Sequence, residues 1–361
     1  MTSIEVYETL KREFQEFQPD LVYFFNGRIT THLPAKLLCR RMGIEYYSYE
    51  VSRKQNSYRL IKNASVHEII PMVVVNSVRS NWNNEQKKVA ESFFRQKRMG
   101  KSIYNLLTFT NDQTKGRLPI GFDKNKKNIG IFNSTIDEKA YVEGSENTIY
   151  EPDDTAGIGQ ILETFEQDSR YMFYLRVHPN MRNRSNSLSQ LVDIRELSSR
   201  YCNLCVIWQN DKIDSYALMD ACEKIITFSS TIGYEATYWG KPSILANSGA
   251  YDNFGCAYTP KTHDELVKLL ETDLEPLPAD FALQYAYWQL SDGIPFESFK
   301  ETEFKNGLAV GTFDGIKIKP SALPSLWYGI NLFLWRVSKG IANPLLVFKK
   351  LKKYLGLTPN I

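Results

Sequence analysis

The stretch Thr227-Phe-Ser-Ser-Thr-Ile-Gly-Tyr-Glu-Ala-Thr-Tyr-Trp-Gly-Lys-Pro-Ser243 decides the fold of this chain. It predicts a buried strand that ends in small hydroxyl residues, a helix that begins at once, and a turn into the next strand. A helix N-terminus carries unpaired backbone N–H groups and a partial positive charge. Because Ser229, Ser230 and Thr231 add hydroxyl donors at this point, we expect the turn to bind a phosphate or a carboxylate.

The same alternation of strands and helices extends along the chain. In the second half, strands are predicted at Asn128–Phe132, Met172–Val177, Leu204–Trp208, Lys224–Phe228 and Ser243–Leu245. Helices are predicted between them, near 155–166, 187–200, 213–220, 231–239 and 263–271. The first half begins with a helix over 4–17, a strand at Leu21–Phe25, a helix through Cys39 and a strand at Ile44–Tyr49, and has one long polar helix over 77–98. The pattern predicts the α/β class with parallel sheets.

We predict four segments. These are a short N-terminal domain at 1–123, a C-terminal domain at 124–278, a crossover back to the first domain at 279–320, and a basic amphipathic helical tail at 321–361. The tail combines apolar runs with basic residues, and no acidic residue follows Asp314. A helix of this kind can lie on an anionic membrane surface. The alternative is a helix that packs on the N-terminal domain and leaves its lysines in water.

Composition narrows the class of protein. The chain has 361 residues, of which 43% are hydrophobic and 24% charged, as in globular proteins. Five cysteines and no evident secretion signal favour a reducing compartment. No apolar run is long enough to span a membrane. We therefore expect a cytoplasmic protein, peripheral on the inner face of the cytoplasmic membrane, and the basic tail lacks the pattern of a nucleic-acid-binding module.

Polar residues follow the predicted strands where ligands bind in open α/β sheets, at the carboxyl ends. The candidates are Asn26, Arg28 and Glu50 in the first half, and Asn133, Ser134, Thr135, Arg176, His178, Pro179, Ser229, Ser230, Thr231 and Glu235 in the second. Because the clusters divide between two units, we expect a cleft between two domains.

Three of the candidate groups in the second half have a plainer alternative. Residues 133–135 can approach a phosphate closely or simply cap a helix. Arg176 and His178 lie on one side of a strand and could neutralise a leaving phosphate, or the histidine could be structural. Glu235 could bind ribose hydroxyls or be a surface carboxylate.

In the first half of the chain, Glu50 and His67 are the candidates for a general base, and each could instead be a structural residue. Arg28 could hold an anionic group. The sequence has no P-loop, zinc motif or Asp-x-Asp element, so we expect neither a catalytic metal nor a cofactor.

Several of these motifs resemble one family. Phe25-Asn-Gly-Arg28, Tyr46-Tyr-Ser-Tyr-Glu50, Ile131-Phe-Asn-Ser-Thr-Ile-Asp-Glu138, Arg176-Val-His-Pro179 and Ser229-Ser-Thr-Ile-Gly-Tyr-Glu235 resemble bacterial capsular-polysaccharide glycosyltransferases of the GT-B fold. The His-Pro and Ser-Ser/Thr pairs also resemble Kdo transferases and sialyltransferases. The resemblance implies two Rossmann-like parallel-sheet domains that face a cleft. It places the nucleotide and its phosphate at His178 and Pro179, a phosphate or sugar carboxylate at residues 229–231, and the acceptor near Asn26, Arg28 and Glu50.

The function predicted from these residues is transfer of a sugar, which could be CMP-activated, from a nucleotide-sugar to a surface polysaccharide or glycolipid. The catalytic candidates are Glu50, His67 and His178. The acidic motif that supplies the sialyltransferase base is not evident. Three alternatives stay open: a nucleotide-sugar 2-epimerase, a CDP-glycerol glycerophosphotransferase, and a polysaccharide-binding or assembly protein with a degenerate cleft.

Overall fold

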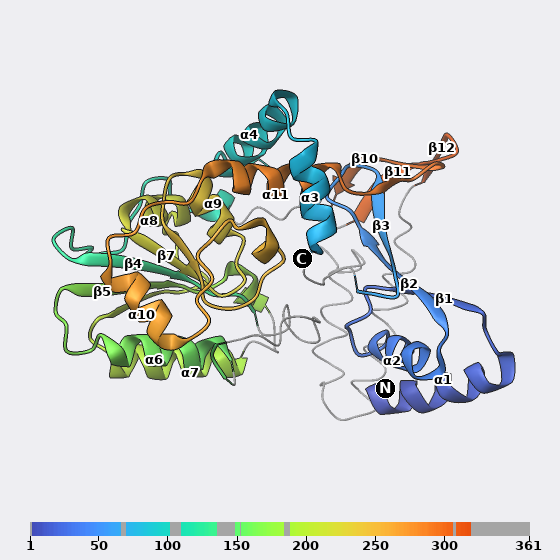
Figure 1. Ribbon diagram of the computed structural model, residues 1–361, viewed down its shortest axis with the longest axis horizontal. Coiled ribbons are helices and arrows are strands. Elements are labelled where there is room, and N and C mark those ends of the chain that lie inside the picture. The colour runs from blue at the N-terminus through green and yellow to red at the C-terminus, as the bar shows by residue number, and fades with distance from the viewer. Residues whose placement is uncertain are drawn as a thin grey trace, which may run out of the picture. The chain divides into compact units, whose positions relative to one another are not determined.

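The computed structural model describes residues 2–65, 70–101, 110–135, 149–151, 153–183, 188–305 and 308–318 (Figure 1). The chain divides into two compact units, Met1–Pro295 and Phe296–Ile361. The finer boundaries at 123, 278 and 320 stay predictions. The predicted base His67 and the predicted tail at 321–361 lie outside the described residues. No helix within these ranges is both long and apolar enough to cross a membrane.

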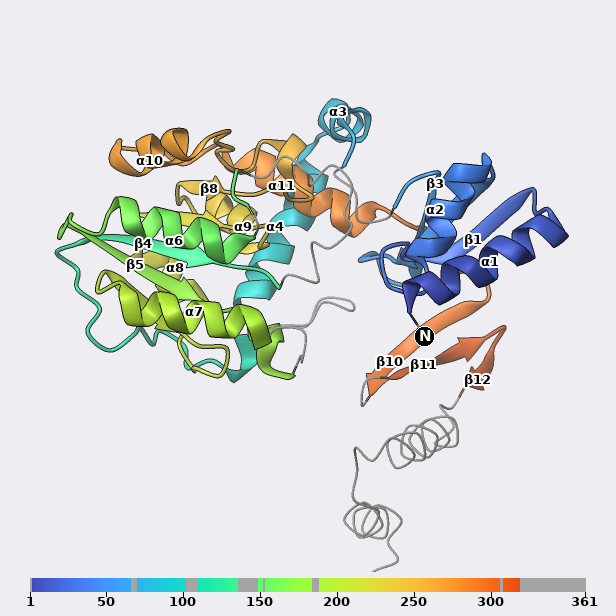
Figure 2. The ribbon, with the colours of Figure 1, turned by 90° about the horizontal axis from the view of Figure 1, so that it is seen from below.

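The first sheet of the larger unit has the strand order β1-β2-β3-β9. Its strands are β1 (Leu21–Phe25), β2 (Glu45–Val51), β3 (Ser57–Lys62) and β9 (Ile294–Pro295). β1 and β2 are parallel, as expected, whereas β3 and β9 extend the sheet through antiparallel pairs that the sequence did not predict. Helices α1 (Ser3–Phe17) and α2 (Leu33–Met42) lie side by side against this sheet (Figure 2). A small core joins them around Phe14, Phe24, Leu38 and Tyr46.

The second sheet has five strands in the order β6-β5-β4-β7-β8, and every pair is parallel. The strands are β4 (Lys127–Phe132), β5 (Tyr171–Arg176), β6 (Leu204–Ile207), β7 (Lys224–Thr227) and β8 (Ser243–Leu245). The helices around it are α6 (Asp154–Thr164), α7 (Leu188–Arg200), α8 (Ser215–Ala221), α9 (Ile232–Tyr238) and α10 (His263–Glu271). These bounds agree within a few residues with the predicted strands and helices, so the α/β class with a doubly wound parallel sheet is confirmed.

Apolar side chains cover both faces of this sheet. On one face, residues of α6, α7 and α10 pack with alternate strand residues such as Ile131 and Phe173. On the other face, residues of α8 and α9 pack with Phe132 and Tyr174. Figure 1 shows the strands between these two sets of helices. Since a strand points successive side chains to opposite faces, the continuous apolar runs of the sequence follow directly from burial on both sides.

The long polar helix predicted over 77–98 is wrong in extent. The chain forms two helices, α3 (Met72–Ser80) and α4 (Asn84–Arg98). Asn83 adopts an extended conformation, and its side chain accepts hydrogen bonds from the backbone N–H groups of Glu85 and Gln86 at 3.0 and 3.1 Å. Because this N-cap begins a new helix at Asn84, the segment forms two helices where the sequence pattern predicted one. α4 packs against α11 (Ala279–Ser291), which also contacts α9.

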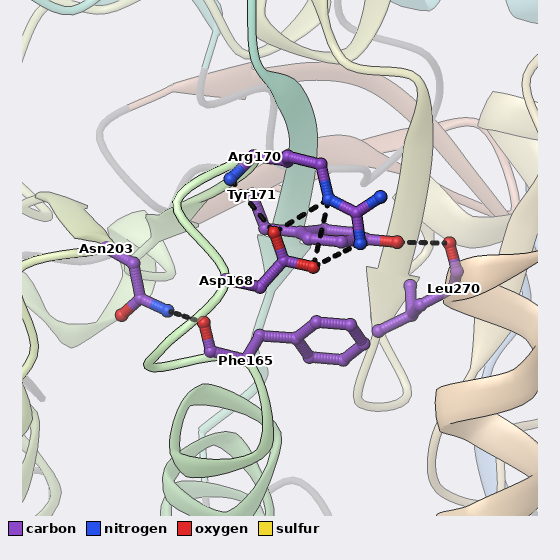
Figure 3. Close-up of polar contacts among 6 residues, drawn as sticks. All are labelled: Phe165, Asp168, Arg170, Tyr171, Asn203 and Leu270. Carbon is purple, nitrogen blue, oxygen red and sulfur yellow. Dashed lines mark hydrogen bonds and ion pairs between the residues drawn. The ribbon is translucent and has the colours of Figure 1, made fainter.

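At the amino end of β5, polar groups satisfy one another (Figure 3). The Asp168 carboxylate accepts a hydrogen bond from the Arg170 guanidinium at 2.6 Å, and this contact holds the pKa of the carboxyl at about 2. The Asn203 amide donates to the carbonyl of Phe165 at 3.1 Å. The first contact stabilises the turn between α6 and β5, and the second joins the start of this turn to the residue before β6. We therefore assign a structural role to this edge of the sheet.

The smaller unit contains an antiparallel sheet of three strands in its described part, in the order β10-β11-β12. They are β10 (Phe299–Lys305), β11 (Leu308–Phe313) and β12 (Ile316–Ile318). The sequence predicted a crossover here and no strands.

Candidate functional site

The site begins at the point where the second sheet reverses its winding. From β4 the chain adds β5 and β6 on one side, and then returns to add β7 and β8 on the other side. Ligands of doubly wound sheets bind at the carboxyl ends of the strands at this switch point. Residues 133–135 follow β4, and residues 229–231 follow β7. Since β4 and β7 are paired neighbours, two clusters predicted separately follow the two strands that flank the switch point.

Asn133 and His178 are brought together at this edge. The Asn133 side chain is 1% exposed, and its Oδ1 accepts a hydrogen bond from the backbone N–H of His178 at 3.0 Å. The His178 ring is half-buried, and its Nδ1 accepts the backbone N–H of Asn180 at 3.1 Å. A neutral ring therefore carries its proton on Nε2. Pro179 is buried and begins the 3-10 turn η2 (Pro179–Asn183).

Ser134 and Thr135 are both buried beside Asn133. The backbone carbonyl of Ser134 accepts a hydrogen bond from the Gln190 amide at 3.1 Å. The Thr135 hydroxyl is buried and has no hydrogen-bond partner among the described residues. A helix capped by these residues would begin in the segment after 135, which is not described.

Arg176 was predicted to be able to neutralise a leaving phosphate, but its side chain is buried within the protein and only 2% exposed. Its Nη1 donates to the carbonyl of Trp208 at 2.6 Å, and its Nη2 donates to the carbonyl of Asp211 at 3.3 Å. Its Nε donates to the hydroxyl of Ser215 at 3.4 Å. Burial lowers the pKa of this guanidinium to about 10, although nearby Asp211 opposes the shift. In this arrangement Arg176 holds the loop between β6 and α8.

The β7–α9 turn is shaped by Ser229, which adopts a left-handed conformation with φ of 65°. Its hydroxyl donates a hydrogen bond to the carbonyl of Ser248. The carbonyl of Ser230 accepts a hydrogen bond from the Tyr251 hydroxyl at 2.9 Å. Tyr251 also contacts the Thr227 hydroxyl at 3.1 Å, so the turn is braced against the loop that follows β8.

Glu235 is 2% exposed, which rules out the surface carboxylate. Its Oε1 forms an ion pair with Lys97 of α4 and accepts a hydrogen bond from the Thr231 hydroxyl at 3.1 Å. Its Oε2 accepts a hydrogen bond from the Tyr216 hydroxyl at 2.5 Å. Both carboxylate oxygens are thus engaged within the protein. A ribose at Glu235 would have to exchange with one of these partners.

The acceptor-side candidates gather at the carboxyl ends of β1 and β2. Asn26 adopts a left-handed conformation with φ of 63°, and its amide donates to Oε2 of Glu50 at 2.9 Å. Its Oδ1 accepts the backbone N–H of Arg28 at 3.3 Å. Three residues that the sequence grouped by position alone are therefore one cluster. In the part of the chain that the structure describes, no group of acidic, histidine or cysteine side chains is arranged to hold a metal ion.

Sequence reasoning missed Lys97 and Tyr216, which contact the Glu235 carboxylate, and it also missed Asn247 and Asp252, which follow the neighbouring strand β8. Nothing in the sequence around Lys97 distinguishes it from the other cations of a polar helix. Asn247, by contrast, lies just after β8 and could have been found by the same rule that found the other clusters.

Comparison with known proteins gives structural likenesses only. No profile of a known protein family matches the chain, and no curated protein matches it. Among solved structures, a KpsC β-Kdo 2,4-transferase from Thermosulfurimonas dismutans is 17% identical, over 74% of this chain and 79% of that chain, with a TM-score of 0.45. A KpsC β-Kdo 2,7-transferase from the same organism is 13% identical, over 90% and 89% of the two chains, with a TM-score of 0.40. The S. aureus MnaA–UDP structure is 12% identical, over 81% and 74%, with a TM-score of 0.33.

Proposed function

We propose that this chain is a GT-B-type glycosyltransferase that moves a sugar from a nucleotide-sugar to a growing surface polysaccharide or glycolipid. The observation that carries the proposal is the pair of polar clusters, 133–135 and 229–231, on the two strands that flank the switch point. Polar groups at this point of a doubly wound sheet are typical of nucleotide sites. The predicted motifs at 25–28, 46–50 and 176–179 support the same class of enzyme.

In this proposal the donor phosphates lie between the two clusters, and His178 faces the phosphate that leaves. The acceptor hydroxyl forms a bond to the anomeric carbon while the bond from that carbon to the phosphate oxygen breaks. The hydroxyl proton passes to a base, for which Glu50 is the described candidate. The negative charge that develops on the phosphate is stabilised by the Nε2–H of His178 and by the hydroxyl of Ser230. Arg176 acts by holding the loop after β6, not by touching the phosphate.

The predicted tail supports a proposal about where the acceptor lies. Eight lysines and arginines follow Asp314, and six of them lie in the basic tail at 321–361. We propose that it contacts an anionic membrane surface, which would bring the enzyme to a membrane-borne acceptor.

The test is a thermal-shift panel with CMP, CDP, UDP, GDP and ADP on three proteins: the wild type, His178→Ala and Arg170→Ala. Arg170 is the matched control because it is a cation that precedes β5, whereas His178 follows the carboxyl end of the same strand. A nucleotide at 100 times its Kd stabilises the folded state by about 2.7 kcal/mol. We expect one nucleotide to do so, and we expect its Kd to rise about 10-fold or more in His178→Ala but not in Arg170→Ala.

Two results would count against the proposal. If no nucleotide raises the unfolding temperature of the wild type, the donor site is wrong and a glycan-binding protein becomes the better reading. If a nucleotide-sugar is converted to its 2-epimer without any acceptor, the chain is an epimerase and not a transferase.

A further inference from the structure

A cavity of about 250 Å³ lies at the carboxyl end of β8, one strand beyond the switch point. Its lining includes Asn247, Ser248, Asp252, Thr259, Pro260 and Lys261. None of them belongs to the clusters described above. The volume is slightly below the usual range of roughly 300–1,000 Å³ for small-molecule sites, so it suits one small ring rather than a whole nucleotide.

The cavity shares a wall with the β7–α9 turn. The Ser229 hydroxyl donates directly to the carbonyl of Ser248, which lines the cavity. The backbone N–H of Ala246 donates to the carbonyl of Thr227 at 2.9 Å. Through its bond to Ser230, Tyr251 fixes the same loop from its other end. The Ser229–Ser248 contact therefore places the cavity directly beside the turn at which we propose that a phosphate binds.

The lining fits a sugar better than a base or a phosphate. Asn247, Ser248 and Thr259 bring amide and hydroxyl groups, while Ile149 and Pro260 bring apolar surface for the C–H groups of a ring. No aromatic side chain is among the described residues of the lining, so a nucleobase would find no ring to stack on.

The amide and the carboxylate of the lining are held in place. The Asn247 side chain is 7% exposed, and its amide donates to Asp154 at 2.9 Å. Oδ1 of Asp252 accepts the backbone N–H of Gly249 at 2.8 Å, and no described residue donates to its Oδ2. Burial raises the pKa of Asp252 to about 6, so the group is largely an anion at neutral pH. A carboxylate accepts well from sugar hydroxyls, and Lys261, which also lines the cavity, can donate to their oxygens. Because these two charges offset each other, the lining has no net positive charge that would favour a sugar with its own carboxylate.

We propose that this cavity binds the sugar of the donor, that the sugar is neutral and rich in hydroxyls, and that Asn247, Ser248 and Asp252 select it. The inference rests on the proposed function, since the sugar enters while its phosphate is held at the neighbouring turn. It deepens that function by choosing a neutral sugar over the carboxylated sugars that a CMP-activated donor would carry.

The experiment compares each bare nucleotide with its sugar conjugate by isothermal titration of the full chain. The pairs are UDP with UDP-glucose, GDP with GDP-mannose, ADP with ADP-glucose, CDP with CDP-glucose, and CMP with CMP-N-acetylneuraminic acid. The variants are Asp252→Asn, whose amide oxygen can still accept from Gly249, and Thr259→Val on the other wall. Asp264→Asn is the matched control, because Asp264 is an exposed carboxylate in the first turn of α10 and does not line the cavity.

We expect one neutral sugar to tighten binding about 10-fold over its bare nucleotide in the wild type and in Asp264→Asn. In Asp252→Asn this gain falls to about 2-fold or less, and in Thr259→Val it falls partway, while the Kd of the bare nucleotide does not change. A gain that survives Asp252→Asn overturns the sugar subsite alone. A gain that occurs only with CMP-N-acetylneuraminic acid overturns the choice of a neutral sugar. If no nucleotide binds to the wild type, the proposed function is wrong, and the sugar site that depends on it is wrong as well.

Discussion

The ion pair between Lys97 and Glu235 should be among the strongest single contacts that hold α4 against α9. Replacing Lys97 by Met leaves the Glu235 carboxylate 2% exposed and without its opposite charge. Breaking one partner of a buried pair costs about 3–5 kcal/mol. The Lys97 side chain is 18% exposed, and the Tyr216 and Thr231 hydroxyls still reach the carboxylate. We therefore expect the lower end, a loss of about 3 kcal/mol in the free energy of unfolding.

The assay is urea denaturation of the wild type, Lys97→Met, Glu235→Gln and the double variant. Glu235→Gln keeps an acceptor for Tyr216 and leaves Lys97 partly in water, so we expect it to lose only about 1–2 kcal/mol. The double variant should be more stable than the sum of the single losses predicts, by about 1 kcal/mol or more. Lys87→Met is the matched control. Lys87 lies on the same helix and pairs with Asp280 at 3.1 Å, but the two side chains are 41% and 50% exposed, so its loss should stay below about 1 kcal/mol.

Two outcomes would refute this reasoning. One is a loss in Lys97→Met no larger than that in Lys87→Met, and the other is additivity of the two single losses within about 0.5 kcal/mol. The same proteins test whether Glu235 binds ribose. A nucleotide Kd that is identical in the wild type and Glu235→Gln would oppose that role and leave the carboxylate a purely structural group.

Three further changes have defined outcomes. The pKa of Asp252 is raised from an ordinary value near 3.8 to about 6, so its contribution to stability is present below about pH 4 and is lost as the pH rises through 6. Urea denaturation should therefore find Asp252→Asn more stable than the wild type at pH 8, by up to about 3 kcal/mol, with a gap that closes toward pH 4; an equal gap at both pH values would contradict this. Gly233→Ala places a Cβ at 2.2 Å from the Tyr251 hydroxyl, so thermal unfolding should show a loss of about 1–3 kcal/mol, and an unchanged unfolding temperature would mean that the brace on the β7–α9 turn is not tight. Asn133→Ala removes the acceptor for the backbone N–H of His178, so we expect urea denaturation to show a loss of about 1–3 kcal/mol, and an unchanged stability would mean that this hydrogen bond does not hold the turn after β5.

The second sheet and the position of its polar clusters could be predicted because both depend on local sequence. Apolar runs such as Ile129–Phe132 mark strands buried on both faces, and the chain direction then fixes which end of each strand is the carboxyl end. In the first sheet, only β1 and β2 could be predicted in this way. β3 pairs antiparallel with the predicted strand β2, and β9 pairs in turn with β3. A short edge strand such as Ile294–Pro295 has almost no periodic pattern of its own.

The sequence by itself thus determined the alternation of elements, the α/β class, and the residues that follow each strand. Only the tertiary structure decided what those residues do. Glu235 is engaged by a lysine 138 residues away, and Arg176 reaches the carbonyls of a loop more than thirty residues downstream. The cavity at Asp252 exists because a loop after β8 is braced on a turn after β7. A periodic pattern reports the burial of a side chain within its own element, whereas its hydrogen bonds and charge partners depend on which elements pack beside it.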